Sequence, residues 1–299
     1  DVCSSDLTIL IGEKFLPKDI TKTKEKIDFS GFACIAIAIM TFFGGIFLGQ
    51  ESGFGSLQSY LLFIIAVIAL GLFIMVERKR KSPLIKFAIF KNKIFTLSLL
   101  SAVLIFASNF FVNVVIPFYL QDARKLSASY AGLLMMVFPL LMVVGAPLSG
   151  YLTDKIGPGI LTFGGLLLLC CTSLMYMFLD MNSPIWYYVI ATAIMGLGNA
   201  LFQSPNNTMV MSSVEKQDLG VAGSMNSFAR NLGMVIGIAL STTILYRGMS
   251  EAYGERVTTY LANRPDIFIV GMRETFFVAF LLCVAAFILT ILRFRKTTK

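Results

Sequence analysis

Long apolar runs separated by short polar segments dominate this sequence. Several of these runs reach or exceed the ~20 residues that cross the hydrocarbon core of a bilayer as an α-helix. We predict eight transmembrane helices, at residues 29–48, 58–76, 94–120, 130–152, 160–180, 186–211, 220–246 and 271–293. Transmembrane β-strands would alternate lipid-facing and lumen-facing residues, and a run such as Tyr60–Val76 shows no such alternation. The pattern therefore predicts an all-α polytopic membrane protein.

Composition excludes a water-soluble fold. The chain of 299 residues is 57% hydrophobic and only 14% charged, whereas soluble domains contain about 25% charged residues. One water-soluble core of this length could not bury so much apolar surface.

The basic residues are distributed unevenly between the two sides of the predicted membrane. Eighteen of the 25 Lys and Arg fall before the first complete span, in even-numbered connections or in the C-terminal tail. Six fall in odd-numbered connections, and Arg230 lies inside a span. Because Lys and Arg concentrate in cytoplasmic loops, we expect both termini in the cytoplasm. A separate expectation is that the membrane is a plasma membrane, the bacterial cytoplasmic membrane. The asymmetry also accounts for the net charge of +8, so we expect no nucleic-acid partner.

A basic connection at residues 77–93 divides the chain. Two extra helices precede it (29–76), a six-helix bundle follows it (94–293), and a short cytoplasmic tail ends the chain (294–299). The connection mixes apolar and basic residues, which fits a short helix in the lipid headgroup layer, a basic tether, or both. Residues 1–28 are expected to be the cytoplasmic end of a preceding helix and a linker, so that the chain is the C-terminal part of a longer protein. The six-helix bundle divides into three and three, and an odd number of spans per unit predicts 3+3 inverted repeats.

The stretch GYLTDKIGPG, Gly150–Gly159, interrupts a long uncharged region between two predicted helices. Gly150 would let a neighbouring helix approach, and Gly157 would allow a tight reversal. Asp154 would cap the following helix and favour its positive dipole end, and Lys155 would supply a cytoplasmic cation. These are the features of a well-formed helical hairpin, and the residues alone leave open whether the loop has a further role.

Polar side chains recur at helical spacing within three predicted spans, where function is expected in a membrane protein. They are Asn109 and Asn113; Asn199, Gln203 and Asn206; and Asn226 and Arg230. We expect them to line a substrate cavity, but the sequence leaves open the alternative that the amides form interhelical hydrogen bonds. Gly233 and Gly237 continue the third stripe as a G-x-x-x-G surface for close helix packing.

Arg230 lies deep within its span, where an unpaired guanidinium is costly. The last six predicted spans contain Asp and Glu only at outer ends, as Asp180 and Glu274. The partner of Arg230 is therefore expected to be water in a cavity, a carbonyl, a lipid phosphate, or a carboxylate from a part of the protein that this sequence does not include. Since the chain has no His and no carboxylate in mid-span, it shows no obvious proton-coupling group.

The sequence indicates neither an enzyme nor a metal site, and we expect no cofactor. Four of the five cysteines lie within predicted spans and are expected to be buried, inert thiols. We find no nucleophile–base pair, metal-ligand set or phosphate-binding loop.

Two motifs resemble a known family. The pattern G-x-x-x-D-K-x-G at Gly150–Gly157 resembles the cytoplasmic loop signature of the major facilitator superfamily, although Pro158 and Gly159 stand where that family often has basic residues. The stretch GLGNALFQSPNNTMVMSSVEKQDLGVAGSMNSFARNLGMVIGIAL (Gly196–Leu240) resembles the fourteen-helix drug/proton antiporter branch. The arrangement of two plus six helices is also similar to that branch, which inserts two helices between its six-helix halves.

This resemblance implies a transporter that exports lipophilic, often cationic drugs or toxic compounds by alternating access, driven by inward proton flow. Its partners would be a small-molecule substrate, protons, membrane lipids and a missing N-terminal six-helix half that carries the key acids. Two alternatives stay open: a permease of the same superfamily for a specific metabolite, and a membrane scaffold or sensor that transports nothing.

Overall fold

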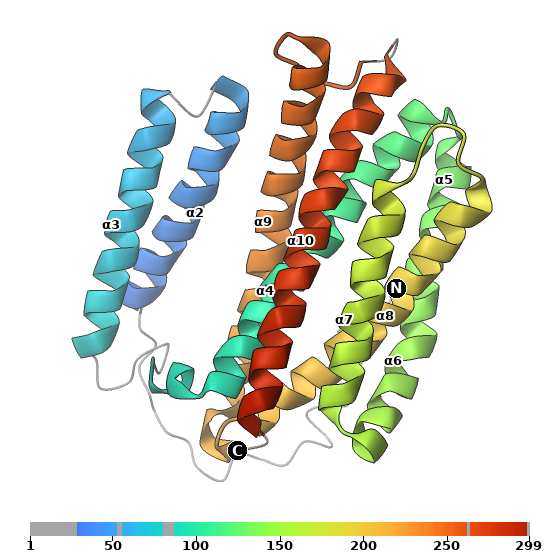
Figure 1. Cartoon of the computed structure of the whole chain (residues 1–299). Coiled ribbons are helices and arrows are strands. Elements are labelled where there is room, and N and C mark those ends of the chain that lie inside the picture. The colour runs from blue at the N-terminus through green and yellow to red at the C-terminus, as the bar shows by residue number, and fades with distance from the viewer. Residues whose placement is uncertain (1–28, 53–55, 80–86, 262–263, 298–299) are drawn as a thin grey trace, which may run out of the picture.

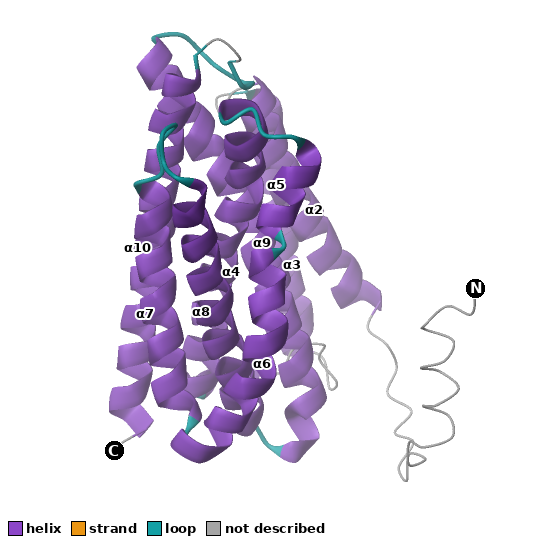
Figure 2. Ribbon diagram, turned by 90° about the vertical axis from the view of Figure 1, so that its right-hand side faces the viewer, coloured by secondary structure: helices purple, strands orange, loops and turns teal. Residues whose placement is uncertain are grey.

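The computed structural model describes residues 29–52, 56–79, 87–261 and 264–297. Within these residues the secondary structure is helical, with short loops at the two ends of the bundle (Figure 2). The α-helices are α2 (Phe29–Ser52), α3 (Leu57–Lys79), α4 (Lys93–Phe118), α5 (Ala128–Met135), α6 (Val137–Ile156), α7 (Pro158–Met177), α8 (Ile185–Ser212), α9 (Leu219–Tyr253) and α10 (Pro265–Thr297).

Eight helical stretches in the described part of the chain are long and apolar enough to cross a membrane, with α5 and α6 forming one of them. The predicted all-α polytopic architecture is thus confirmed. The boundaries differ most at the C-terminal end: α9 extends beyond both ends of the predicted span 220–246, and α10 extends beyond both ends of 271–293. Residues 294–297, expected to be part of the tail, belong to α10.

The helices from α4 to α10, which make six membrane-crossing elements because α5 and α6 form one, pack into one bundle (Figure 1). In this bundle α4 packs against α9 and α10, while α8 packs against α6 and α7. In chain order, α4, α5–α6 and α7 correspond to α8, α9 and α10. Under this correspondence, the contacts of α4 with α9 and α10 become the contacts of α8 with α6 and α7. The helix neighbours therefore follow the predicted 3+3 division. Large side chains such as Phe111, Tyr176 and Phe276 are fully buried between the helices.

Helices α2 and α3 form a hairpin beside the bundle (Figure 1). They pack mainly against each other, and α2 also touches α9. Many of their large apolar side chains are exposed, among them Met40, Leu57 and Val67. Such exposure is unfavourable in water but fits a helix pair surrounded by lipid.

The basic connection 77–93 falls partly outside the described residues. Its described part contains a short 3₁₀-helix, Phe87–Lys91, next to α4. Asn92 then caps α4, because its Oδ1 accepts hydrogen bonds from the backbone N–H groups of Ile94 and Phe95. Its Nδ2 donates to the carbonyl oxygen of Ser213 at 2.6 Å. This residue therefore ties the start of α4 to the end of α8.

Glycines allow the bundle helices to approach closely. A Cβ atom on Gly233 would lie 2.5 Å from the carbonyl oxygen of Val103, and one on Gly237 would collide with the backbone of Ala107. Both glycines of the G-x-x-x-G surface thus lie where α9 crosses α4.

Candidate substrate cavity

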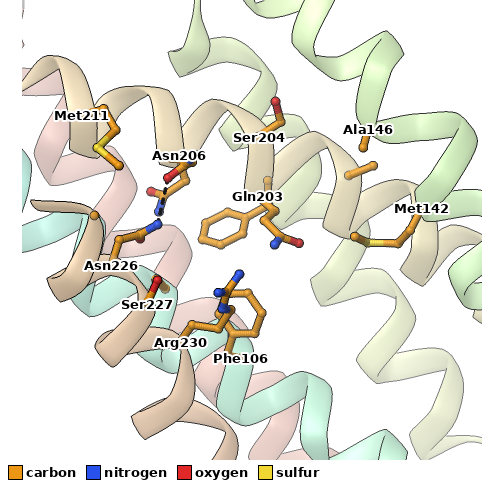
Figure 3. A pocket seen from close by; sticks show the side chains of 15 residues that line it. Phe106, Met142, Ala146, Gln203, Ser204, Asn206, Met211, Asn226, Ser227 and Arg230 are labelled. Carbon is orange, nitrogen blue, oxygen red and sulfur yellow. Dashed lines mark hydrogen bonds between the residues drawn. The ribbon is translucent and has the colours of Figure 1, made fainter. Parts of the chain in front are cut away.

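A cavity of about 620 Å³ lies between α4, α6, α8 and α9 (Figure 3). Helices α7 and α10 do not contribute to its lining. Its walls are formed by Ala102, Phe106, Met142, Ala146, Ala200, Phe202, Gln203, Ser204, Asn206, Asn207, Met211, Gly223, Asn226, Ser227 and Arg230. Small-molecule sites commonly occupy about 300–1,000 Å³ and combine apolar walls with a few polar groups. The size and the lining of this cavity fit that description.

Four of the seven residues that the sequence singled out as cavity candidates line this space: Gln203, Asn206, Asn226 and Arg230. The two helices that carry them run antiparallel and are consecutive in the chain. The last turns of α8 therefore face the first turns of α9. Because polar positions on each helix recur at spacings of three and four, they share one face.

The other three candidates, Asn109, Asn113 and Asn199, lie outside the cavity lining. Asn109 and Asn199 are buried, and their side-chain amides exchange hydrogen bonds between α4 and α8. Asn113 is exposed and donates to the carbonyl oxygen of Asn109 at 3.2 Å. In this structure the amide pair joins two helices, which is the alternative that the sequence left open.

Arg230 is partly exposed and lies in the wall formed by α9. Within the part of the chain that the structure describes, its guanidinium has neither an ion-pair nor a hydrogen-bond partner. Figure 3 shows this guanidinium and the amide of Gln203 turned toward the same space from opposite walls. Arg230 therefore presents a positive charge and hydrogen-bond donors to the cavity.

Asn207 is a lining residue that the sequence analysis missed. Its Oδ1 accepts a hydrogen bond from Asn226 Nδ2 at 2.8 Å, which links α8 to α9 at the cavity wall. The signal was present, because Asn207 directly follows Asn206 in the stretch QSPNN. Asn207 also follows Gln203 by four residues, so the two share a face of α8, and the polar stripe could have included Asn207 as well as Asn206.

A buried arginine behind the cavity was also missed. Arg293 is the last residue of the predicted span 271–293, and its charge was counted with that of the cytoplasmic tail. The structure instead buries it within α10, with 1% of its surface exposed. Its Nη1 donates to Ser98 Oγ at 2.8 Å and to Asn206 Oδ1 at 3.0 Å. Asn206 Nδ2 in turn donates to the carbonyl oxygen of Ser98 at 3.3 Å. These contacts join α4, α8 and α10 and hold the side chain of a cavity residue.

The GYLTDKIGPG stretch forms the turn between α6 and α7. Gly157 alone separates the two helices. Its backbone angles, φ 87° and ψ 151°, are ones that residues other than glycine rarely adopt. Pro158 occupies the first turn of α7, where its missing N–H is tolerated. Gly159 packs directly beneath the ring of Phe294. These local demands account for proline and glycine at positions where the family that the motif resembles often has basic residues.

Two details of this loop differ from expectation. Asp154 does not cap α7, because it lies in the last turn of α6 and Gly157 occupies the cap position without a side-chain hydrogen bond. Asp154 and Lys155 are exposed, and the Lys155 ammonium lies 4.5 Å from the centre of the Tyr151 ring. Helix α6 does not approach α8 most closely at Gly150. The close contacts lie at Gly145, where an added Cβ would lie 2.8 Å from that of Ala200, and at Gly196 of α8.

The fold and the cavity together define a polytopic helical membrane protein with a ligand-sized polar cavity inside a six-helix bundle. The sequence profile of the Major Facilitator Superfamily matches residues 29–238 and 99–299. The chain therefore belongs to the major facilitator superfamily. Members of this superfamily are membrane transporters and not enzymes.

Several curated proteins are similar to the chain. It is 28% identical to a riboflavin transporter of Clostridioides difficile, over 98% of the chain and 62% of that protein. It is 31% identical to an uncharacterized transporter of Escherichia coli, over 80% of the chain and 52% of that protein. It is 27% identical to a multidrug transporter of Bacillus subtilis, over 80% of the chain and 44% of that protein. The chain thus spans about half the length of these relatives. The similarity to the multidrug transporter of Bacillus subtilis supports the predicted likeness to the drug-efflux branch.

Proposed function

We propose that the chain is one part of a secondary transporter that exports lipophilic compounds, cationic drugs among them, from the cytoplasm by alternating access. The observation that carries this proposal is the cavity of about 620 Å³, whose walls combine Phe106 and Phe202 with amides and one guanidinium. Such a mixture suits compounds with a large apolar body and a few polar groups. The similarity to proteins named as multidrug transporters supports the same substrate class.

A second six-helix unit would complete the cavity. The described walls come from four helices of one bundle, and the polar face made by α8 and α9 includes exposed residues such as Asn207 and Ser227. The length of the relatives supports such a unit, because the chain covers only about half of them. Rocking of the two units around the cavity would open it alternately to each side.

Proton coupling would rest on the facing unit. Among the described residues that line the cavity there is no Asp or Glu, and a coupling site needs a group that changes charge in the working pH range. A carboxylate on the facing unit would supply it. The excess of basic residues in one set of connections supports cytoplasmic termini. The similarity to transporters of Clostridioides difficile and Bacillus subtilis supports the plasma membrane of a bacterium.

Dye transport by the complete gene product tests this proposal. Inside-out vesicles from bacteria that express it should accumulate a lipophilic dye against its gradient when the membrane is energised, and a protonophore should abolish the accumulation. Empty-vector vesicles provide the control. If correctly folded protein moves no compound of a chemically broad panel, or if accumulation persists without a proton gradient, the proposal is wrong.

A permease for one metabolite is the second candidate. The observation that favours it is the similarity to a protein named as a riboflavin transporter, which extends over 98% of the chain. A narrow permease would be inhibited by its own substrate and close analogues only. A multidrug exporter would be inhibited by many unrelated lipophilic compounds, so a competition panel separates the two.

A further inference from the structure

The described lining of the cavity carries one positive charge and no negative charge. Arg230 is the single charged side chain among the described lining residues, and the remainder are neutral. In a region of low dielectric constant, an unbalanced charge acts more strongly on a ligand than it would in water. The cavity wall therefore favours a group with negative charge.

The amides of the cavity differ in what they can still offer a ligand. Both polar atoms of the Asn206 amide are engaged, with Arg293 and with the carbonyl oxygen of Ser98. Asn226 and Asn207 bond to each other. Among the amide and guanidinium groups of the cavity, only Gln203 and Arg230 make no hydrogen bond within the described residues, and the two face each other across it (Figure 3).

The groups left available are mainly donors. A guanidinium carries five N–H donors and no acceptor, and its planar fork matches a carboxylate. Gln203 adds an N–H₂ group from the opposite wall, while Ser204 and Ser227 add hydroxyls. The apolar walls beside them, Phe106 and Phe202, can hold the rest of a ligand.

We propose that Arg230 and Gln203 form a binding site for a carboxylate or a similar anionic oxygen group on the transported compound. This inference rests on the proposed transport function, whose substrate class it narrows: the cavity wall of this chain binds the acidic end of amphipathic organic acids. Cationic compounds would use this cavity only where an acid from the facing unit neutralises Arg230.

A pair of dyes that differ in one carboxylate tests the site. Rhodamine B carries a free carboxylate, and its ethyl ester lacks it while keeping the same ring system. The complete gene product in lipid nanodiscs should bind rhodamine B more tightly than the ester, as measured by fluorescence anisotropy. Arg230→Gln should weaken rhodamine B binding at least tenfold and change ester binding less than threefold. Arg230→Lys should give an intermediate value, because it keeps the charge but loses the fork.

Matched variants distinguish the site from a general effect. Arg247→Gln removes an exposed arginine from the same helix, outside the cavity, and should alter neither affinity. Gln203→Glu adds a negative charge to the opposite wall and should weaken rhodamine B selectively. Equal affinity of the wild type for both dyes, or equal losses in Arg230→Gln, would overturn the inference.

Transport is measured separately on the same proteins. Selective binding that depends on Arg230, without proton-driven movement of any dye, would support the site and refute the proposed function. Proton-driven efflux of both dyes with no effect of Arg230→Gln on their ratio would support the function and refute the site.

Discussion

Arg293 and Asn206 are joined by a hydrogen bond of 3.0 Å from the guanidinium Nη1 to the amide Oδ1, across the interface between α10 and α8. Both residues are almost fully buried. Asn206 also lines the cavity, so this bond links a buried cation to a surface that a ligand would touch. The position of a cavity side chain thus depends on a residue at the far end of the last helix.

Removing either partner of this bond should destabilise the bundle. Arg293→Met leaves the buried Oδ1 of Asn206 without this donor, and an unsatisfied buried group costs about 1–3 kcal/mol. Asn206→Leu leaves the buried guanidinium without this acceptor and should cost as much or more. In the double variant both groups are gone, so we expect its loss to be smaller than the sum of the single losses. Thermal melting of the purified complete gene product measures the four proteins of the cycle, with Arg247→Met as the exposed control. Strictly additive losses would show that the two side chains do not interact.

Gly157→Ala should lower the stability of the α6–α7 turn. The backbone angles of Gly157 lie in a region that is almost restricted to glycine, and other residues there cost about 1–3 kcal/mol. Gly164→Ala is the matched control, because Gly164 lies inside α7 and an added Cβ would meet no atom within 4 Å. We expect a lower melting temperature for Gly157→Ala and no loss for Gly164→Ala. Equal melting temperatures would contradict the argument from backbone geometry.

Asp154→Asn should reduce transport more than it reduces the amount of folded protein. The Asp154 side chain is exposed and makes no hydrogen bond within the described residues, so its neutralisation removes no contact that holds the bundle together. A loss of transport would then reflect interactions that form while the helices rearrange. Dye efflux per folded molecule, with folded protein counted by fluorescence-detected gel filtration, measures the effect. Parallel loss of folding and transport would indicate that the loop is only a structural hairpin.

The charge asymmetry predicts the orientation of the chain. In a cysteine-free background, Lys216→Cys should be protected from a membrane-impermeant thiol reagent applied outside intact cells, because it lies in a connection assigned to the cytoplasm. Glu255→Cys, in the connection between α9 and α10, should react. Both positions are exposed, so burial would not explain a difference between them. Labelling at 216 but not at 255 would reverse the assigned topology.

The number and type of the membrane-crossing segments followed from hydropathy, because the thickness of a bilayer constrains each segment separately. The helix boundaries followed less well. Residues 265–270 and 294–297 continue α10 beyond the predicted span 271–293. At the N-terminal end the span was drawn too short, because Ile267, Phe268, Ile269 and Val270 are apolar. At the other end a helix can extend past the hydrocarbon core as long as its backbone hydrogen bonds continue. The charge of Arg293 was counted with the tail because this residue ends the predicted span, and hydropathy gave no sign that α4 and α8 would enclose it.

What the sequence by itself determined is therefore local: eight helices, a tight turn at Gly157, and polar faces on α4, α8 and α9. Only the tertiary structure decided which of those polar faces meet. Asn109 and Asn199 are 90 positions apart and bond to each other, whereas Gln203, on the same face of α8 as Asn199, lines the cavity. Helical spacing shows that two residues share a face, but the packing of other helices decides whether a given turn of that face meets a neighbouring helix or an open space.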